Sequence, residues 1–180
     1  KWGFINKKEQ IIIKPQFDFA SDFVNGLAPV KRNGKYGFID MTGDFVIAPK
    51  YDYAHSFKNG LAHVGMNQKW GYIDRKGNLA IAPQFGFAKN FSEGLAAVQL
   101  GSKWGYIDKK GDFVIEPEFR YGGSFSSGLA PVQRNDKWGY IKRDGKFVVR
   151  PQFNNARDFA EGLASVQLGG THGGVDKQRL

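Results

Sequence analysis

The 180-residue chain contains no cysteine. This absence excludes disulfide bonds, thiolate nucleophiles and cysteine-ligated metals, and it leaves the redox state of the compartment undetermined. A chain without such cross-links needs a larger apolar core. Its aromatic residues, 15% of the total, favour strands over helices, and its 24 glycines favour tight turns between them.

Long apolar segments are absent as well. No run approaches the roughly 18 residues that a membrane-crossing helix requires, and no basic-then-apolar signal segment opens the sequence. No transmembrane segment is therefore predicted. Because the chain begins at Lys1, inside a motif that recurs later, we expect a processed or excised piece of a secreted or cell-envelope protein whose targeting segment is missing.

Positive charge exceeds negative charge, with 26 Lys and Arg against 17 Asp and Glu and a formal net charge of +9. This balance favours anionic partners such as nucleic acid, anionic glycans, lipid headgroups or acidic proteins. The sign of the charge does not choose among them.

A motif of lysine, aromatic residue, glycine, aromatic residue and isoleucine recurs every 34 residues, and a Phe-x-x-Gly-Leu-Ala block keeps the same register. Such regularity is typical of stacked repeat proteins. We predict a single repeat domain over residues 1–170, followed at 171–180 by a degenerate sixth unit or a frayed tail. Its five units are 1–34, 35–68, 69–102, 103–136 and 137–170.

The pattern within a unit indicates strands, not the paired helices that a period of this length also allows. Lys69–Ile73 is aromatic and β-branched around a glycine, and Asp74–Gly77 has the Asp and Gly of a type I turn. Asn67-Gln68 tolerates the positive φ of a tight hairpin with the preceding Leu-Ala-x-Val strand. Each unit is predicted to be a three-stranded antiparallel meander.

The connection between meanders begins at a recurring proline. We expect Pro83 to end the third strand and the spacing from Phe85 to Phe91 to form about one helical turn. The fold class is predicted to be all-β, an open, twisted, solenoid-like stack of five meanders. A closed five-bladed ring is the alternative, because Leu163–Leu168 is available to pair with Lys1–Ile5.

Both faces of a meander carry apolar groups, so neighbouring units are expected to cover them. At Gly71 the missing side chain is expected to admit a neighbouring unit's backbone or ring. The structural core is predicted at three recurring positions. These are Gly3, Gly37, Gly71, Gly105 and Gly139; Phe23, Phe57, Phe91, Phe125 and Phe159; and Leu27, Leu61, Leu95, Leu129 and Leu163.

The motif Lys-Trp-Gly-Tyr-Ile-Asp-x-x-Gly with the downstream Phe-x-x-Gly-Leu-Ala-x-Val resembles the WG, or KWG, repeat family of bacterial proteins over residues 1–168. Tyr36 replaces the tryptophan of the second unit, and Glu9 stands where the first turn would have glycine. The resemblance implies a β-rich repeat used in many contexts, without shared catalytic residues or a cofactor.

No catalytic or metal-binding constellation is recognisable. His55, His63 and His172 occupy different repeat positions, and His63 is interpreted as drift at a tolerant surface site. The recurring turn carboxylates Asp40, Asp74 and Asp108 are better explained by turn hydrogen bonds than by calcium. No cofactor is expected.

Two sets of recurring residues are candidate ligand-binding groups. The aromatic set could form a ladder for sugar rings or bases, although inter-unit packing is the favoured interpretation. The lysine set could form a row that binds a polyanion, although protection of strand edges is favoured. The residues are Trp2, Tyr36, Trp70, Trp104 and Trp138, and Lys35, Lys69, Lys103 and Lys137.

The predicted function is a noncatalytic binding or scaffolding module for a protein, a glycan or a cell-envelope polymer. The first alternative is salt-sensitive binding of a polyanion or nucleic acid. The second is a hydrolase or transferase site that would depend on His55 or His63.

Overall fold

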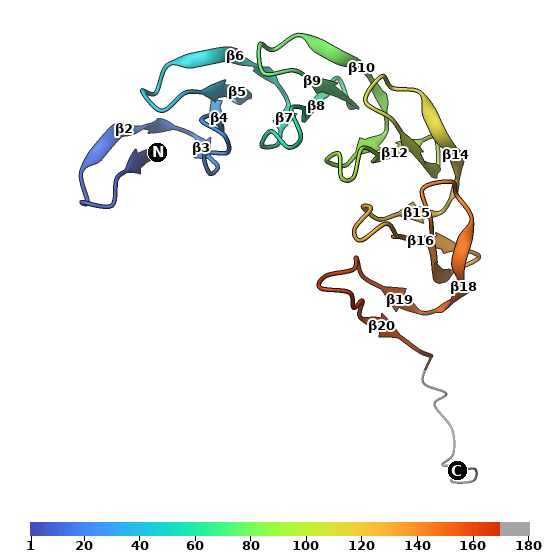
Figure 1. Cartoon of the computed structure of the whole chain (residues 1–180). Coiled ribbons are helices and arrows are strands. Elements are labelled where there is room, and N and C mark those ends of the chain that lie inside the picture. The colour runs from blue at the N-terminus through green and yellow to red at the C-terminus, as the bar shows by residue number, and fades with distance from the viewer. Residues whose placement is uncertain (170–180) are drawn as a thin grey trace.

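Twenty β-strands and no helix make up residues 1–169, the part of the chain that this computed structural model describes. These residues hold no helix of the length and hydrophobicity that a membrane span requires. The strands form four antiparallel sheets of four strands each, with a two-stranded sheet before the first and another after the last. The sheets follow one another along an open arc (Figure 1).

The predicted all-β open stack is therefore confirmed. The alternative ring is not formed, because β1 and β20 lie at opposite ends of the arc. The predicted sixth unit or tail, residues 171–180, lies outside the described residues.

Each complete sheet has the same strand order, from a short first strand on the concave side to a long fourth strand on the convex side. The first strands are β3 (Phe19–Ala20), β7 (Tyr53–Ala54), β11 (Phe87–Ala88), β15 (Tyr121–Gly122) and β19 (Asn155–Ala156). The second strands are β4 (Ala28–Arg32), β8 (Ala62–Met66), β12 (Ala96–Leu100), β16 (Ala130–Arg134) and β20 (Val166–Gln167). The third strands are β1 (Trp2–Ile5), β5 (Lys35–Ile39), β9 (Lys69–Ile73), β13 (Lys103–Ile107) and β17 (Lys137–Ile141). The fourth strands are β2 (Ile11–Phe17), β6 (Phe45–Tyr51), β10 (Leu79–Phe85), β14 (Phe113–Phe119) and β18 (Phe147–Phe153).

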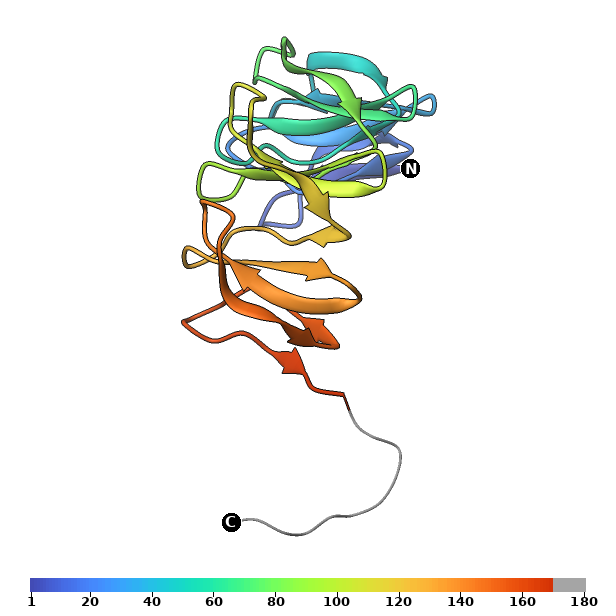
Figure 2. The same ribbon diagram turned by 90° about the vertical axis from the view of Figure 1, so that its right-hand side faces the viewer.

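The complete sheets are named I (β3–β6), II (β7–β10), III (β11–β14) and IV (β15–β18). Each takes its first two strands from one sequence unit and its last two from the next, so sheets and units are offset along the chain. Figure 2 shows the sheets stacked face to face in chain order. This stacking buries the apolar faces that a single sheet leaves exposed.

The segment predicted as a helical turn is instead the first strand of the next sheet. Phe87 and Ala88 form β11 and pair with Gln99 and Val98 of β12. A hairpin follows, closed by two backbone hydrogen bonds between Ser92 and Leu95 of 2.8 and 3.1 Å. The prediction was wrong because the apolar spacing contains no information about the free edge of β12, whose backbone groups need partners.

The recurring proline also differs from its prediction. β10 runs through Pro83 to Phe85, with register shifts against β9 on either side of Ile81. Proline is tolerated there because β10 is the outermost strand of its sheet and is bulged.

The glycine of the motif faces this bulge. A Cβ atom on Gly71 would lie 2.5 Å from the Ile81 carbonyl oxygen and 2.7 Å from the Pro83 nitrogen. The predicted close approach to Gly71 is therefore real, but the approaching backbone belongs to the fourth strand of the same sheet and not to a neighbouring unit.

The predicted turns are present. The Gly77 amide donates to the Asp74 carbonyl at 3.0 Å, and Asp74 Oδ1 accepts from the Lys76 amide at 2.8 Å. At the hairpin between β8 and β9, Asn67 and Gln68 have φ values of 51° and 61°. Such left-handed backbone matches the twist of a two-residue hairpin.

The core lies between the sheets. Tyr106 of sheet III packs edge-on against Phe125 of sheet IV with 5.0 Å between ring centroids. Phe57, Phe91 and Phe125 are at most 2% exposed. Leu163 departs from the predicted core, with 79% exposure, because it lies between β19 and β20 at the end of the stack, where no further described sheet packs over it.

Tyrosine hydroxyls join successive sheets. Tyr106 Oη donates to the Gly123 carbonyl at 2.9 Å, and both residues are buried. Burial raises the pKa of Tyr106, so this hydroxyl stays protonated and remains a donor. Phe38 occupies the same repeat position in sheet I, which shows that the site accepts a ring without the hydroxyl.

Tyr106→Phe is therefore expected to lower the free energy of unfolding by about 1 kcal/mol, because the Gly123 carbonyl loses its side-chain partner in a buried site. Chemical denaturation with a folded-state circular dichroism control measures this loss. A loss above about 3 kcal/mol would contradict the attribution to one hydrogen bond.

Candidate functional site

A row of aromatic side chains runs along the edge of the sheets next to the hairpins between second and third strands. Within sheet III, Phe87 of β11 and Trp104 of β13 both stand opposite Gln99 of β12, so their side chains share one face. Trp104 then contacts Tyr121 of sheet IV, with ring centroids 5.1 Å apart. The members of this aromatic row are Trp2, Phe19, Tyr36, Tyr53, Trp70, Phe87, Trp104, Tyr121 and Trp138.

The row combines predicted and unpredicted residues. Of the predicted candidates, Trp2 is 54% exposed and Trp104 only 6% exposed, so Trp104 is a packing residue and not an accessible ligand contact. Tyr36, Trp70 and Trp138 are half-buried.

The first-strand aromatics were missed, although they form much of the accessible surface of the row. Tyr53 is 60% exposed, Phe19 42% and Phe87 41%. Their recurrence every 34 residues was visible in the sequence, but they fall within the segment that was interpreted as a helical turn.

The row is interrupted at one place. Ring contacts connect Trp2 to Tyr36 through Phe19, and other contacts run from Tyr53 to Trp138. Within residues 1–169 no ring contact joins Tyr36 to Tyr53. A cavity of about 290 Å³ lies there, between sheets I and II. Its lining residues are Phe19, Ser21, Pro29, Tyr36, Tyr53, Ala54, His55 and Ser56.

The equivalent space between sheets II and III is filled by two imidazole rings. His55 and His63 stand where Ser21 and Pro29 stand one unit earlier, and their rings stack with centroids 4.1 Å apart. The His63 ring also lies 5.4 Å from the ring of Trp70.

His63 is thus buried, at 5% exposure, and the prediction of a tolerant surface site was wrong. Its Nδ1 lies 3.1 Å from Asn90 Oδ1. Burial, with a smaller effect of His55, lowers the pKa of His63 from its ordinary 6.5 to about 3. The ring is therefore neutral at physiological pH. The sequence did not reveal the pair because His55 follows β7 whereas His63 lies in β8, and only the pairing of the two strands brings them together.

Between sheets III and IV the space is occupied by a lysine. Lys89, at the repeat position of Ser21, places its Nζ 4.4 Å from the Tyr121 ring centroid and 5.6 Å from that of Trp104. The same Nζ donates to Tyr121 Oη at 2.8 Å.

A second cavity, of about 560 Å³, lies between sheet IV and β19 at the same repeat position. Here Gly123 and Pro131 leave space, as Ser21 and Pro29 do between sheets I and II. The lining of this cavity differs from that of the first. Asn155 stands at the position of Tyr53, and Lys89, Arg157 and Asp158 contribute charges.

The predicted lysine row is not uniformly basic. Lys35 forms an ion pair with Asp52, and Lys137 Nζ contacts Asn154 Oδ1 at 2.5 Å. The position of Asp52 is occupied by Gly86 in the unit of Lys69 and by Arg120 in the unit of Lys103, so neither lysine has a carboxylate there. The charge of the row therefore varies from sheet to sheet.

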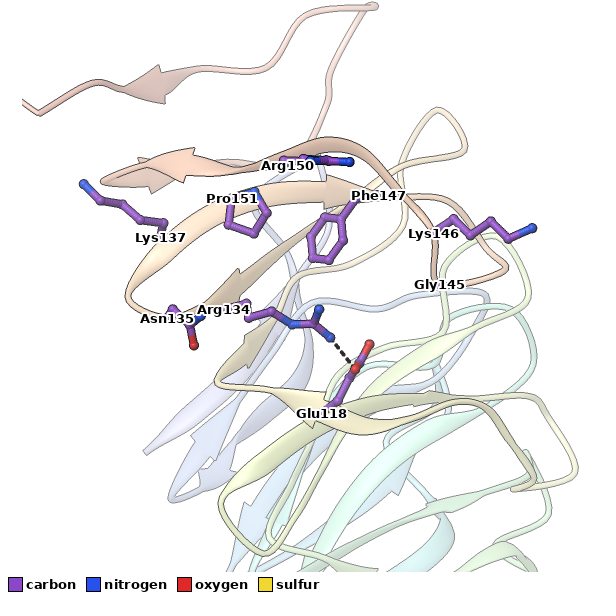
Figure 3. A pocket seen from close by; sticks show the side chains of 9 residues that line it. All are labelled: Glu118, Arg134, Asn135, Lys137, Gly145, Lys146, Phe147, Arg150 and Pro151. Atoms are coloured by element: carbon purple, nitrogen blue, oxygen red, sulfur yellow. Dashed lines mark hydrogen bonds and ion pairs between the residues drawn. The ribbon is translucent and has the colours of Figure 1, made fainter.

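Positive charge is concentrated in a recess of about 660 Å³ on the convex side, between sheets III and IV (Figure 3). The Arg134 guanidinium lies over Phe147, 5.3 Å from its ring centroid, and pairs with Glu118. Lys137, Lys146 and Arg150 complete the charged lining. Four cationic side chains and one carboxylate thus line this site, which we call the basic recess.

Within the described residues no group of three or more histidine and carboxylate side chains is arranged to hold a metal ion. Asp40, Asp74 and Asp108 each accept backbone hydrogen bonds within their own turns. Hydrogen bonds from Thr42 and Asn78 lower the pKa values of Asp40 and Asp74.

Comparison with known proteins places these observations in a family. The WG containing repeat matches five consecutive segments, residues 2–36, 36–70, 70–104, 104–138 and 138–171. The chain belongs to this family. The resemblance inferred from the sequence is thereby confirmed, and the offset sheets and the interrupted aromatic row describe how this WG-repeat chain folds.

No curated protein matches the WG-repeat chain. Among solved structures, "KlHsv2 with loop 6CD replaced by a Gly-Ser linker" is similar, with a TM-score of 0.52 and 12% identity over 83% of this chain. The chain spans 62% of that protein's length, and the likeness concerns the fold alone.

Two plant proteins of Cicer arietinum have lower TM-scores. A plant lectin with two metal binding sites has a TM-score of 0.32 at 12% identity, over 81% of this chain and 87% of its own. A plant albumin showing hemagglutination has a TM-score of 0.29 at 14% identity, over 66% and 82%. At these TM-scores neither supports a conclusion about the WG-repeat chain.

Proposed function

We propose that this WG-repeat chain is a noncatalytic binding module that holds an extended glycan or envelope polymer along the aromatic row. The supporting observation is the row itself, in which partly exposed rings recur in each of sheets I to IV along one rim. Aromatic rings offer rigid apolar faces at low entropic cost, and successive rings suit a ligand with successive units. Multiple weak contacts along one polymer then add to a useful avidity.

The test is an array of neutral glycans and envelope polymers, probed with the whole chain at low and high salt. Binding to a neutral polymer should be retained at high salt, because the polymer carries no phosphate or carboxylate groups whose counterions would be released on binding. In a double variant, Phe87→Ala with Tyr121→Ala, we expect at least about tenfold weaker binding, since each stacked ring typically contributes ~1–3 kcal/mol.

The matched control is Val114→Ala with Val148→Ala. These valines are both 49% exposed, but they lie on the convex strands β14 and β18, away from the row. This variant should bind like the natural sequence. Equal loss in both variants, or no loss in the row variant, would contradict binding along the row.

The basic recess favours a second candidate function, the binding of a polyanion. Lys137, Lys146 and Arg150 lie around it, and the only carboxylate in its lining, Glu118, already pairs with Arg134. Heparin binding that falls steeply with salt and is lost in Lys146→Ala with Arg150→Ala would support it. Salt-insensitive binding, or none, would contradict it.

A further inference from the structure

The cavity between sheets I and II has two features that occur together at no other junction within residues 1–169. Two tyrosines of the aromatic row, Tyr36 and Tyr53, line it from opposite sheets, and no side chain occupies the space between them. Its volume of about 290 Å³ is close to the lower limit of about 300 Å³ for small-molecule pockets.

The open space follows from two small residues. Ser21 stands where the next two units have His55 and Lys89, both of which reach into their own junctions. Pro29 stands where the next two have His63 and Ala97. The fold therefore accommodates filled junctions, and the first one is left open by its sequence and not by the geometry of stacking.

The lining chemistry selects the ligand. Its residues include no Asp, Glu, Lys or Arg, and burial lowers the pKa of His55, so the imidazole is neutral at physiological pH. A charged ligand would lose hydration there without a compensating partner. Lys31 Nζ, 5.4 Å from the Tyr36 ring centroid, further disfavours a cation such as a quaternary ammonium.

Polar groups are nevertheless present. Ser21, Ser56, Tyr36 and Tyr53 contribute hydroxyls, each able to donate and to accept a hydrogen bond. Apolar ring faces next to several neutral hydroxyls match a pyranose, which has carbon–hydrogen faces and a periphery of hydroxyls.

We infer that this cavity binds one neutral pyranose unit of a glycan, which rests against the rings of Tyr36 and Tyr53. The inference rests on the proposed function and specifies a subsite within it. The remaining members of the aromatic row would contact the neighbouring units of the same glycan.

The experiment uses the whole chain and a panel of neutral tetrasaccharides of glucose, mannose, galactose and N-acetylglucosamine, measured by saturation-transfer NMR and titration. At least one should bind, with little change at high salt. Tyr53→Ala should weaken its binding at least about tenfold, as expected for one lost stacking ring, whereas Tyr53→Phe should retain most of it.

A second variant closes the cavity with residues that the protein already uses. Ser21→Lys with Pro29→Ala introduces the pair found at Lys89 and Ala97, and should abolish tetrasaccharide binding. The control Val114→Ala shortens a partly exposed apolar side chain on the convex strand β14, outside the aromatic row, and should leave tetrasaccharide binding within about twofold of the natural chain. Thermal unfolding of each variant establishes that the fold is retained.

Three results would overturn the inference. The first is that no tetrasaccharide binds, and the second is that the cavity-filling variant, Ser21→Lys with Pro29→Ala, binds as well as the natural chain. The third is that adenosine or acetylcholine, added as further probes, bind and no tetrasaccharide does. The proposed function is separable, because it depends on Phe87 and Tyr121. Polymer binding that is lost in Phe87→Ala with Tyr121→Ala but persists in the cavity-filling variant would support the row as a binding surface. The same result would refute the pyranose subsite.

Discussion

Gly71→Ala is expected to destabilise the protein by about 3 kcal/mol or more, the upper end of what overpacking costs in a buried site. The added Cβ would lie 2.5 Å from the Ile81 oxygen, 2.7 Å from the Pro83 nitrogen and 2.9 Å from the Ala82 carbonyl carbon. All three atoms are backbone, so no side-chain rotation relieves the overlap. β10 would have to move away from β9 and break the bulged pairing that completes sheet II.

Gly86→Ala is the matched control in the same unit. Its Cβ would meet nothing nearer than 3.4 Å, and the nearest atom is the side-chain oxygen of Gln99. Gly86 has no left-handed φ, so alanine there should be neutral or slightly stabilising through the unfolded state. Guanidinium denaturation of both variants measures the difference. Equal stabilities would show that the motif glycine is not required by the approach of the fourth strand.

Because the sheets stack on one another, the stability lost in Gly71→Ala is not confined to sheet II. Each sheet contacts only its neighbours, and sheet II lies inside the stack, between sheets I and III. Unfolding of sheet II therefore uncovers the inner faces of both neighbours. We expect the denaturation curve of the Gly71 variant to broaden as well as shift, because the two remaining parts unfold separately.

The sequence predicted the fold because the information was local and repeated. The hairpin at Asn67-Gln68 and the type I turn at Asp74–Gly77 are determined by the backbone preferences of a few adjacent residues. The exact period showed that the units stack, since identical positions repeated in register must meet identical neighbours.

The errors concern partners that are distant in the sequence. The strand at Phe87–Ala88 exists because the edge of β12 is free to pair with it, and Gly71 is needed because Pro83 bulges toward it. Neither fact is contained in the local pattern. Spacing alone indicated a turn of helix in the first case and a neighbouring unit in the second.

The candidate site was only partly predictable for the same reason. The tryptophan positions were found from their recurrence, but whether a ring is accessible depends on what the next sheet places against it. Tyr121 and Lys89 cover Trp104, whereas Tyr53 leaves a cavity beside Tyr36. The decisive difference lies in residues that vary between units, such as Ser21 and Lys89, within a scaffold that does not vary.

His63 is expected to make the stability of the protein depend on pH. The folded-state pKa of about 3 lies below the ordinary 6.5, so the unfolded chain binds a proton between these values and the folded chain does not. Stability is therefore complete above pH 6.5 and decreases as the pH falls toward 3. The slope is at most ~1.4 kcal/mol per pH unit, which over the two units from pH 6.5 gives about 3 kcal/mol of lost stability by about pH 4.5.

His63→Ala isolates this effect, because Ala97 occupies the same repeat position in a buried site. The variant loses packing against His55 and Trp70, so its stability at neutral pH should be lower. Its decrease between pH 7 and about 4.5 should nevertheless be smaller by about 3 kcal/mol than that of the natural chain.

The turn carboxylates do not confuse the measurement. The pKa values of Asp40 and Asp74 are lowered from 3.8 by hydrogen bonds, so the stability they contribute is lost only below that value. Denaturation curves of both proteins at several pH values between 4.5 and 7 give their free energies of unfolding as a function of pH. If these free energies fall in parallel, His63 is protonated in the folded protein. The stacked imidazoles would then not form the neutral, buried pair that fills the junction between sheets II and III.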